Sequence, residues 1–305
     1  MKKSKKSAAR VFIRSCVAVL ASVVLAFALI GCTQPTPQPS EEPAEQPEAQ
    51  TPEPQTTEPE ATPVQLQIFA ANSLERALPE VQALYTAAHP NVTFADTQFK
   101  GSGDLVTEIQ GGAAPDILIT ASKGTMDTAE EGAFIDPASR RDMFGNDLVI
   151  AKGTGTDVQI NALEDVKAES ITSIAIGDAD AVPAGAYANQ ALNTIGLYSD
   201  ASGKGGTYDA AFESKVSIAS SVGNAAKYVE SGDCQIGFVY SSDIFRFSGI
   251  EVALVIPTDA HKPILYPGAI LAGSQNADVA ADFLNFCLTD PGAQKIWSQY
   301  GFEVL

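Results

Sequence analysis

The chain has 305 residues and a formal net charge of −18 at neutral pH, with 37 acidic residues against 19 basic ones. This acidic balance excludes the basic surface with which proteins bind nucleic acid. Residues 64–305 are long enough to form one large domain or two medium domains with real cores.

Residues 1–31 have the composition of a secretory signal peptide. Six basic residues come before an apolar run at 17–30, which is too short and too close to the N-terminus for an ordinary spanning helix. The run ends in LIGC at 29–32, which matches the bacterial lipobox. We therefore predict a lipid on Cys32 and a location at the cell membrane, on its extracytoplasmic side. An uncleaved N-terminal anchor is the alternative.

Residues 32–63 are mainly Pro, Glu, Gln and Thr, with almost no apolar side chains. Such a segment cannot bury enough surface to offset the entropy lost on ordering. We expect a disordered acidic tether, partly in the polyproline conformation, that holds the following domain away from the membrane.

Apolar runs alternate with longer amphipathic stretches through the rest of the chain, a pattern typical of βα units around largely parallel sheets. We expect strands at residues 65–70, 93–99, 116–120, 148–151, 173–176, 216–218, 236–240, 252–256 and 269–271. We expect helices that end near 88, begin near 104, and cover 125–131, 185–195, 223–231 and 277–300. Pro79 lacks an amide donor, so the first helix should either kink or start late.

Small polar or glycine-rich turns follow several of these strands, where a helix begins. They lie at residues 72–73, 100–103, 182–185 and 221–223. Ligands of open α/β sheets collect at the carboxyl ends of strands, and a helix start there presents unpaired N–H groups to an anion. A single such turn is more often a plain helix cap with a benefit of ~1 kcal/mol.

Catalysis and cation binding have little support in the sequence. A nucleophilic Ser73 or Ser102 would need a base, and the two histidines, His89 and His261, both have the surroundings of surface residues. Asp178 and Asp180 lack the further oxygen ligands of a calcium loop. We therefore predict no enzyme activity and no direct cation ligand.

Two cysteines remain in the expected globular part, Cys234 and Cys287. Outside the cytoplasm they can form a disulfide, or they can be two separate buried thiols.

Several short motifs occur in a fixed order along the chain: FAANSL at 69–74, FKGSG at 99–103, GAAPDI at 112–117, GNDLV at 145–149, GD at 177–178, VPAGAYA at 182–188, GFVYSSD at 237–243 and YGF at 300–302. Taken together, they resemble the molybdate-binding proteins of bacterial molybdate ABC transporters. The resemblance extends from about Leu66 to the C-terminus. It implies the type II periplasmic binding protein fold, in which two α/β lobes with mostly parallel sheets close on a ligand. Residues 64–146 and about 250–305 would form the first lobe, and about 147–249 the second.

The resemblance also implies which residues contact the ligand: Ser73, Ser102, Ala184, Val222 and Tyr240. The serines would supply hydroxyl and main-chain donors, Ala184 and Val222 main-chain N–H groups, and Tyr240 its phenol. Molybdate, tungstate and sulfate have no proton at neutral pH, so a site made only of donors suits them, whereas phosphate keeps a proton and needs an acceptor.

The function implied is capture of molybdate, and of tungstate as well, for a membrane permease with its ATPase. No cofactor is implied, and we expect a monomer. Lys100 and Asn72 stand where smaller residues are common in the family, which leaves selectivity open. Three alternatives remain: the same fold with another oxyanion such as sulfate or phosphate, a surface serine hydrolase, and a purely adhesive lipoprotein.

Overall fold

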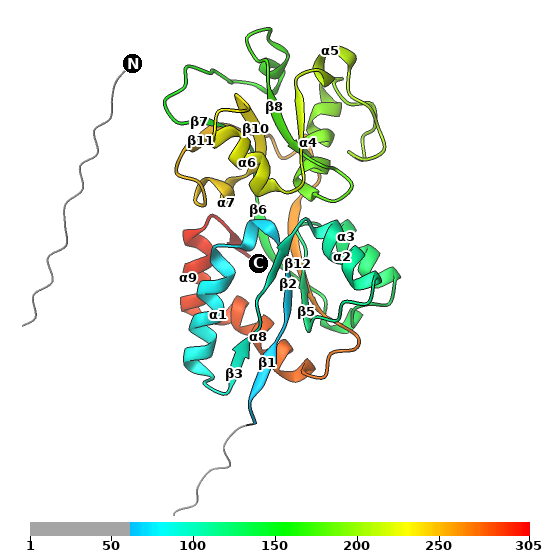
Figure 1. Ribbon diagram of the computed structural model, residues 1–305, viewed down its shortest axis with the longest axis vertical. Helices are drawn as coiled ribbons and strands as arrows, with labels where there is room; N and C mark the ends of the chain where they lie inside the picture. Colours follow the sequence, from blue (N-terminus) through cyan, green and yellow to red (C-terminus); the bar gives the residue numbers. More distant parts are fainter. Residues whose placement is uncertain (1–61) are drawn as a thin grey trace, which may run out of the picture. The chain divides into compact units, whose positions relative to one another are not determined.

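The computed structural model describes residues 62–305, which form two large β-sheets and a short two-stranded one, with helices packed on them (Figure 1). The expected signal peptide, the tether and the lipid site at Cys32 lie outside the described residues. No helix within residues 62–305 is both long enough and apolar enough to cross a membrane.

The first lobe is built on a six-stranded sheet with the order β13-β6-β12-β5-β2-β4. Its strands are β2 (Ile68–Ala71), β4 (Gln98–Lys100), β5 (Ile117–Ile119), β6 (Arg141–Asn146), β12 (Ile264–Ile270) and β13 (Glu303–Val304). A short parallel pair, β1 (Val64–Leu66) and β3 (Val92–Phe94), lies beside it. The helices are η1 (Asn72–Leu74), α1 (Ala77–Ala88), α2 (Ser102–Gln110), α3 (Lys123–Glu131), α8 (Ala277–Thr289) and α9 (Pro291–Gln299).

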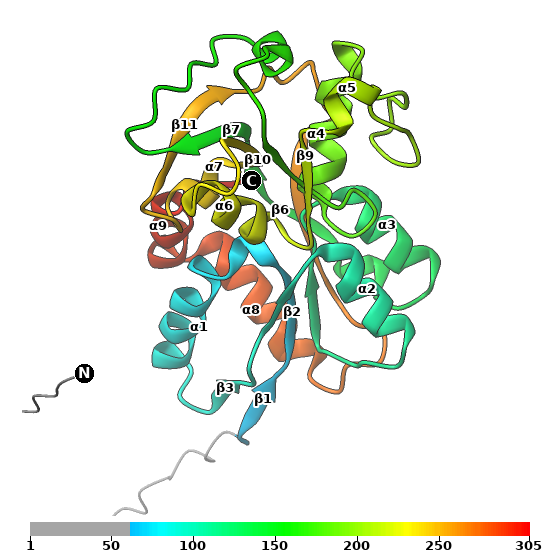
Figure 2. The same cartoon turned by 45° about the horizontal axis from the view of Figure 1, so that its top comes forward.

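Both faces of this sheet are buried at β2 and β5, which explains why these two strands are continuous apolar runs. In β5, Ile117 and Ile119 belong to one core cluster, and Leu118 belongs to a second cluster together with Leu105 of α2 and Met126 of α3. Figures 1 and 2 show the corresponding layers, with α1, α8 and α9 on one side of the sheet and α2 and α3 on the other.

The second lobe is built on a five-stranded sheet with the order β11-β7-β10-β8-β9. Its strands are β7 (Leu148–Gly153), β8 (Ile174–Gly177), β9 (Val216–Ala219), β10 (Ile236–Tyr240) and β11 (Ile250–Val255). Its helices are α4 (Pro183–Thr194), α5 (Ala210–Glu213), α6 (Val222–Glu230) and α7 (Ser241–Ile244).

The chain passes between the sheets twice. It leaves the first sheet after β6 and enters the second at β7, and it returns between β11 and β12. Because β11 pairs with β7, the return comes after Val255, later than the predicted position near residue 250. The sheets are also mixed, not mostly parallel. The strands β6, β7, β11 and β12, which flank the two crossings, pair antiparallel.

The local sequence explains two details of the helices. The helix α1 begins at Ala77, so Pro79 lies in its first turn, where its missing N–H has no intrahelical partner, and the predicted late start is confirmed. The helical range predicted at 277–300 contains two helices, because α8 ends at Thr289 and Asp290 caps the new helix α9 through the N–H groups of Gly292 and Ala293.

The two cysteines are free and buried, Cys234 in the second lobe and Cys287 in α8. Of the two alternatives, separate thiols are therefore correct.

Candidate functional site

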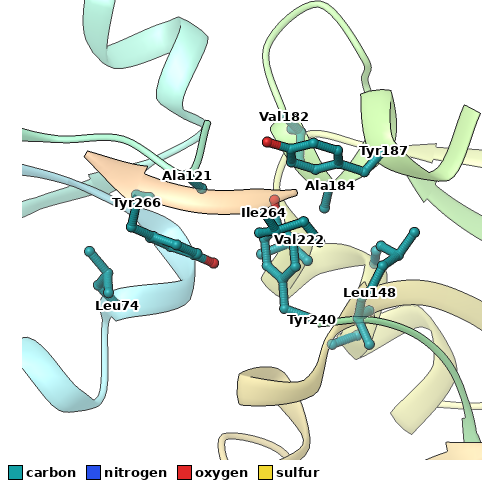
Figure 3. Packing of buried hydrophobic residues seen from close by; sticks show 14 of the residues in the cluster. Leu74, Ala121, Leu148, Val182, Ala184, Tyr187, Val222, Tyr240, Ile264 and Tyr266 are labelled. Carbon is teal, nitrogen blue, oxygen red and sulfur yellow. The ribbon is translucent and has the colours of Figure 1, made fainter. Parts of the chain in front are cut away.

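Four helix starts meet where the two lobes touch. The starts of η1 and α2 come from the first lobe, and those of α4 and α6 come from the second. Between them lies a small cavity with a volume of about 10 Å³. Figure 3 shows its surroundings, with Tyr266 and Ala121 on the first-lobe side and Ala184, Val222 and Tyr240 on the other.

The structure places all the predicted contact residues on the lining of this one cavity: Ser73, Ser102, Ala184, Val222 and Tyr240. Each is at most 4% exposed. They come from positions up to 167 residues apart in the chain, as 73 and 240 show, so only the fold brings them together.

Main-chain N–H groups form part of the lining. Val222 is the first residue of α6, and Ala184 is the second residue of α4, directly after Pro183. N–H groups in a first helical turn have no intrahelical acceptor, and the helix dipole makes this end positive. The arrangement attracts a negatively charged acceptor.

Tyr240 contributes a phenol that is buried against the cavity. It ends β10, and Asp243 accepts a hydrogen bond from its main-chain N–H at 3.0 Å. Its hydroxyl oxygen has no hydrogen-bond partner among residues 62–305. Burial raises the pKa of this phenol well above its ordinary value, so the group keeps its proton and can donate a hydrogen bond.

The two serines are each fixed by one hydrogen bond. The Oγ atom of Ser102 accepts from the main-chain N–H of Ala121 at 3.0 Å. The Oγ atom of Ser73 lies 2.9 Å from the hydroxyl of Tyr266.

Charge in the lining is limited to one residue, Lys100, which forms an ion pair with Glu108. No lining residue described by the structure carries a carboxylate. The nearby Asp243 is buried, which raises its pKa, but Arg246 opposes this shift and binds it at 2.5 Å. The wall can therefore donate hydrogen bonds to a ligand, and it offers no anionic acceptor.

The lobes touch on one side of the cavity through two glycines. The N–H of Gly103 donates to the carbonyl oxygen of Ala181 at 2.9 Å. A Cβ atom on Gly101 or Gly103 would lie 2.8 Å from a main-chain oxygen of Ala181 or Asp180, respectively. Only glycine permits so close an approach of the two main chains.

On the other side, a polar clasp joins the lobes. The N–H of Gly223 donates to Oδ1 of Asn72 at 3.0 Å, and the Arg246 guanidinium binds Glu75 at 2.6 Å. The Arg246 side chain is only 3% exposed. Asn72 therefore acts across the seam between the lobes, and both sets of contacts show a closed form.

The structure also reveals site residues that the sequence analysis missed, namely Tyr266, Asn146 and Arg246. Tyr266 lies in the part of β12 that precedes the predicted strand. This part was not predicted as a strand because it contains Pro267. The sheet accommodates the proline through a shift of register between Tyr266 and Pro267. The polar run at 240–243 offered a signal for Arg246, because Asp243 follows the buried apolar strand β10 and a buried acid needs a basic partner.

Evidence for catalysis or a metal site is lacking in the described residues. Neither Ser73 nor Ser102 has a histidine among its hydrogen-bond partners in residues 62–305. Asp178 accepts a hydrogen bond from the N–H of Asp180 at 3.1 Å, as in an ordinary loop cap. No cluster of possible metal ligands occurs within residues 62–305.

Comparison with known proteins adds independent information. Residues 66–303 match the protein family described as bacterial extracellular solute-binding protein. The molybdate-binding protein ModA of Escherichia coli is 31% identical over 245 residues, which cover 79% of this chain and 89% of the relative. The putative ABC transporter substrate-binding lipoprotein YvgL of Bacillus subtilis is 28% identical over 239 residues, or 78% of this chain and 86% of the relative.

Among solved structures, the substrate binding domain of a putative molybdenum ABC transporter from Clostridium difficile has a similar fold. Its TM-score is 0.60 at 29% sequence identity, and the match covers 79% of this chain and 99% of that one.

The buried phenol of Tyr240 predicts a loss of stability at alkaline pH. In an unfolded chain tyrosine ionises near pH 10, whereas the folded protein keeps the proton on Tyr240. The stability that this difference contributes is fully present below about pH 10 and is lost above it, at ~1.4 kcal/mol per pH unit. We expect Tyr240→Phe to lose about 1 kcal/mol less stability than the parent between pH 9 and pH 11, as measured by urea unfolding.

Ser102→Ala is the control for this prediction, because it alters the same cavity without removing a phenol. Its loss of stability over this pH range should equal that of the parent. An equal loss in all three proteins would contradict the prediction.

Proposed function

Because the chain belongs to the family of bacterial extracellular solute-binding proteins, we propose that it captures molybdate in the cavity between its lobes for uptake by an ABC transporter. The fold is that of the type II periplasmic binding proteins, as the resemblance predicted, and the chain is a binding protein and not an enzyme. In this proposal the oxyanion accepts hydrogen bonds from Ser73, Ser102, Ala184, Val222 and Tyr240.

The observation that supports this proposal most directly is a buried cavity lined by donors without a carboxylate. A fully deprotonated tetrahedral anion accepts hydrogen bonds on every oxygen. It would pair with the Tyr240 hydroxyl, which has no partner within residues 62–305, and with the first-turn N–H groups of α4 and α6. Tungstate has the same charge and shape, so we extend the proposal to it.

The acidic net charge does not oppose the capture of a dianion. Surface charges are screened over about 8 Å at physiological salt, whereas fixed dipoles in a closed, dry cavity act at short range. The affinity should therefore depend only modestly on ionic strength.

The proposal includes the setting of the protein in the cell. The partners are a permease and its cytoplasmic ATPase, and the protein is a monomer held at the extracytoplasmic side of the membrane by a lipid on Cys32. The lipobox at residues 29–32 supports the anchor, and the name of the Bacillus subtilis relative includes the word lipoprotein.

The proposed function predicts a ranking of ligands. Calorimetric titration should give binding heat with molybdate and tungstate, weaker binding of sulfate, and weak or no binding of phosphate, with similar molybdate affinity at low and high ionic strength. Absence of heat with both molybdate and tungstate would reject the function. Tighter binding of sulfate or phosphate would favour the same fold with another oxyanion as its ligand.

Removal of single donors should weaken binding. A hydrogen bond to a charged group contributes about 1.5–3 kcal/mol, so Tyr240→Phe and Ser102→Ala should each raise the Kd for molybdate roughly 10- to 100-fold. Tyr208→Phe is the matched control, because its hydroxyl binds Asn189 at 2.7 Å and does not line the cavity. Unchanged affinity in both site variants would place the ligand elsewhere.

Closure should depend on the glycine that touches the opposite lobe. Gly103→Ala introduces a Cβ atom 2.8 Å from the Asp180 carbonyl oxygen, and overpacking of this kind costs ~1–3 kcal/mol. We expect about a tenfold or greater rise in the Kd for molybdate, and less compaction on ligand addition in small-angle scattering. Gly124→Ala, also in the first turn of a helix but with open space at its Cβ, should behave as the parent.

Equal Kd values for Gly103→Ala and Gly124→Ala would show that the contact between Gly103 and Ala181 contributes nothing to closure.

A further inference from the structure

A series of hydrogen bonds leads from Asn146, at the junction of the lobes, to the cavity. The Nδ2 atom of Asn146 lies 3.2 Å from the Tyr266 hydroxyl, and this hydroxyl lies 2.9 Å from Oγ of Ser73. Tyr266 is 0% exposed and Ser73 is 2% exposed, so water does not compete for these groups.

Asn146 sets which groups donate and which accept in this series of hydrogen bonds. Its Oδ1 atom accepts from the main-chain N–H of Asp147 at 2.9 Å and from the Ser241 hydroxyl at 2.8 Å. A main-chain N–H can only donate, so the amide oxygen must face it, and the amide nitrogen must face Tyr266. An amide nitrogen also only donates, so the Tyr266 oxygen accepts from Asn146.

The Tyr266 hydroxyl can then donate its hydrogen bond to only one of its two partners. Burial raises the pKa of this phenol well above its ordinary value, so the proton stays on the oxygen. Within residues 62–305 the hydroxyl has two hydrogen-bond partners, and Asn146 is already a donor. Tyr266 therefore donates to Oγ of Ser73, and the hydrogen of Ser73 is left for the cavity.

Ser102 is also held as a hydrogen-bond donor, but by a different partner. Its Oγ atom accepts from the main-chain N–H of Ala121, which can only donate. Both serine oxygens thus already accept a hydrogen bond from the protein, and both hydroxyl hydrogens remain available to a ligand.

We propose that Asn146 and Tyr266 are positioning residues that hold Ser73 as a hydrogen-bond donor and thereby make the site reject oxyanions that keep a proton. This inference rests on the proposed function and adds a basis for its selectivity. A protonated oxyanion such as hydrogen phosphate must place its O–H against an acceptor. Ser73 already accepts from Tyr266 and directs its own hydrogen to the cavity, and no lining residue described by the structure carries the carboxylate that would accept an oxyanion's proton.

The test is Tyr266→Phe in the full-length protein. The ring keeps its packing against Tyr240 and Phe302, with centroids 5.9 and 5.4 Å away, but Ser73 loses its donor and can rotate to accept. We measure the Kd values for molybdate, sulfate and phosphate by calorimetry and by displacement of molybdate. Sulfate and phosphate are similar tetrahedral anions that differ in the proton.

We expect the ratio of the phosphate Kd to the molybdate Kd to fall at least tenfold in Tyr266→Phe, and the ratio of the phosphate Kd to the sulfate Kd to fall as well. A general loss of stability or closure would weaken all three anions together and leave both ratios unchanged. Tyr208→Phe, which removes a partly buried, hydrogen-bonded hydroxyl elsewhere in the second lobe, should also leave both ratios unchanged.

A second variant reverses the direction of the hydrogen bond and keeps the Tyr266 hydroxyl. In Asn146→Asp an acceptor replaces the amide nitrogen, so Tyr266 turns its proton toward residue 146 and Ser73 loses its donor. The same fall in the ratios is expected. In a Ser73→Ala background, Tyr266→Phe should change the ratios no further, since the effect acts through Ser73.

The outcomes separate this inference from the proposed function. If the parent binds molybdate and neither Tyr266→Phe nor Asn146→Asp changes the ratios, the positioning role is wrong and the function stands. If the parent binds neither molybdate nor tungstate, the function is wrong and the inference fails with it.

Discussion

The structure depends on one constraint: hydrogen-bond donors are buried at a seam between two lobes, where the lining supplies no anionic acceptor. Four helix starts, two serine hydroxyls and one phenol surround a cavity that solvent barely reaches. Buried donors without acceptors cost about 1–3 kcal/mol each, so the closed form gains stability from any anion that accepts from several of them at once. Ligand binding and lobe closure are therefore two aspects of one equilibrium.

The contacts across the seam show how closure is limited to one geometry. On one side Gly101 and Gly103 let main chains approach without side chains between them, and on the other side Arg246 joins Asp243 to Glu75. The η1 turn carries both Ser73, which faces the cavity, and Asn72, which faces the clasp. In the proposed function, an anion bound by Ser73 lies next to Asn72, which makes one of the contacts that keep the lobes together.

The sequence predicted the parts of this site that depend on local pattern. The helix starts at 102, 183 and 222 follow apolar runs and carry turn residues, so an anion site there could be inferred before the structure was known. The family resemblance added which of these starts meet. The alternation of apolar runs gave most strands, although the run at 93–99 proved to be the two short strands β3 and β4.

The remainder depends on contacts between distant segments, which no local pattern encodes. The strand β6 was missed because Arg141 and Asp142 make it polar, and the start of β12 because it contains a proline. These two strands pair with each other next to the crossings, and they carry Asn146 and Tyr266 to adjacent positions. The donor role of the Ser73 hydroxyl could therefore not be predicted from the sequence.

The residue that sets this donor role, Asn146, lies at the junction of the two lobes. Asn146 ends β6 in the first sheet, yet its amide is held by Ser241 and Ser242 of α7 in the second lobe, at 2.8 Å each. The main-chain N–H of Asp147 sets which way this amide faces, and the two serines that follow Tyr240 hold it in place. One short segment, residues 240–242, thus supplies a donor to the cavity directly and also holds the amide that orients a donor on the other lobe. A site with this arrangement selects its ligand by the absence of a proton as well as by charge.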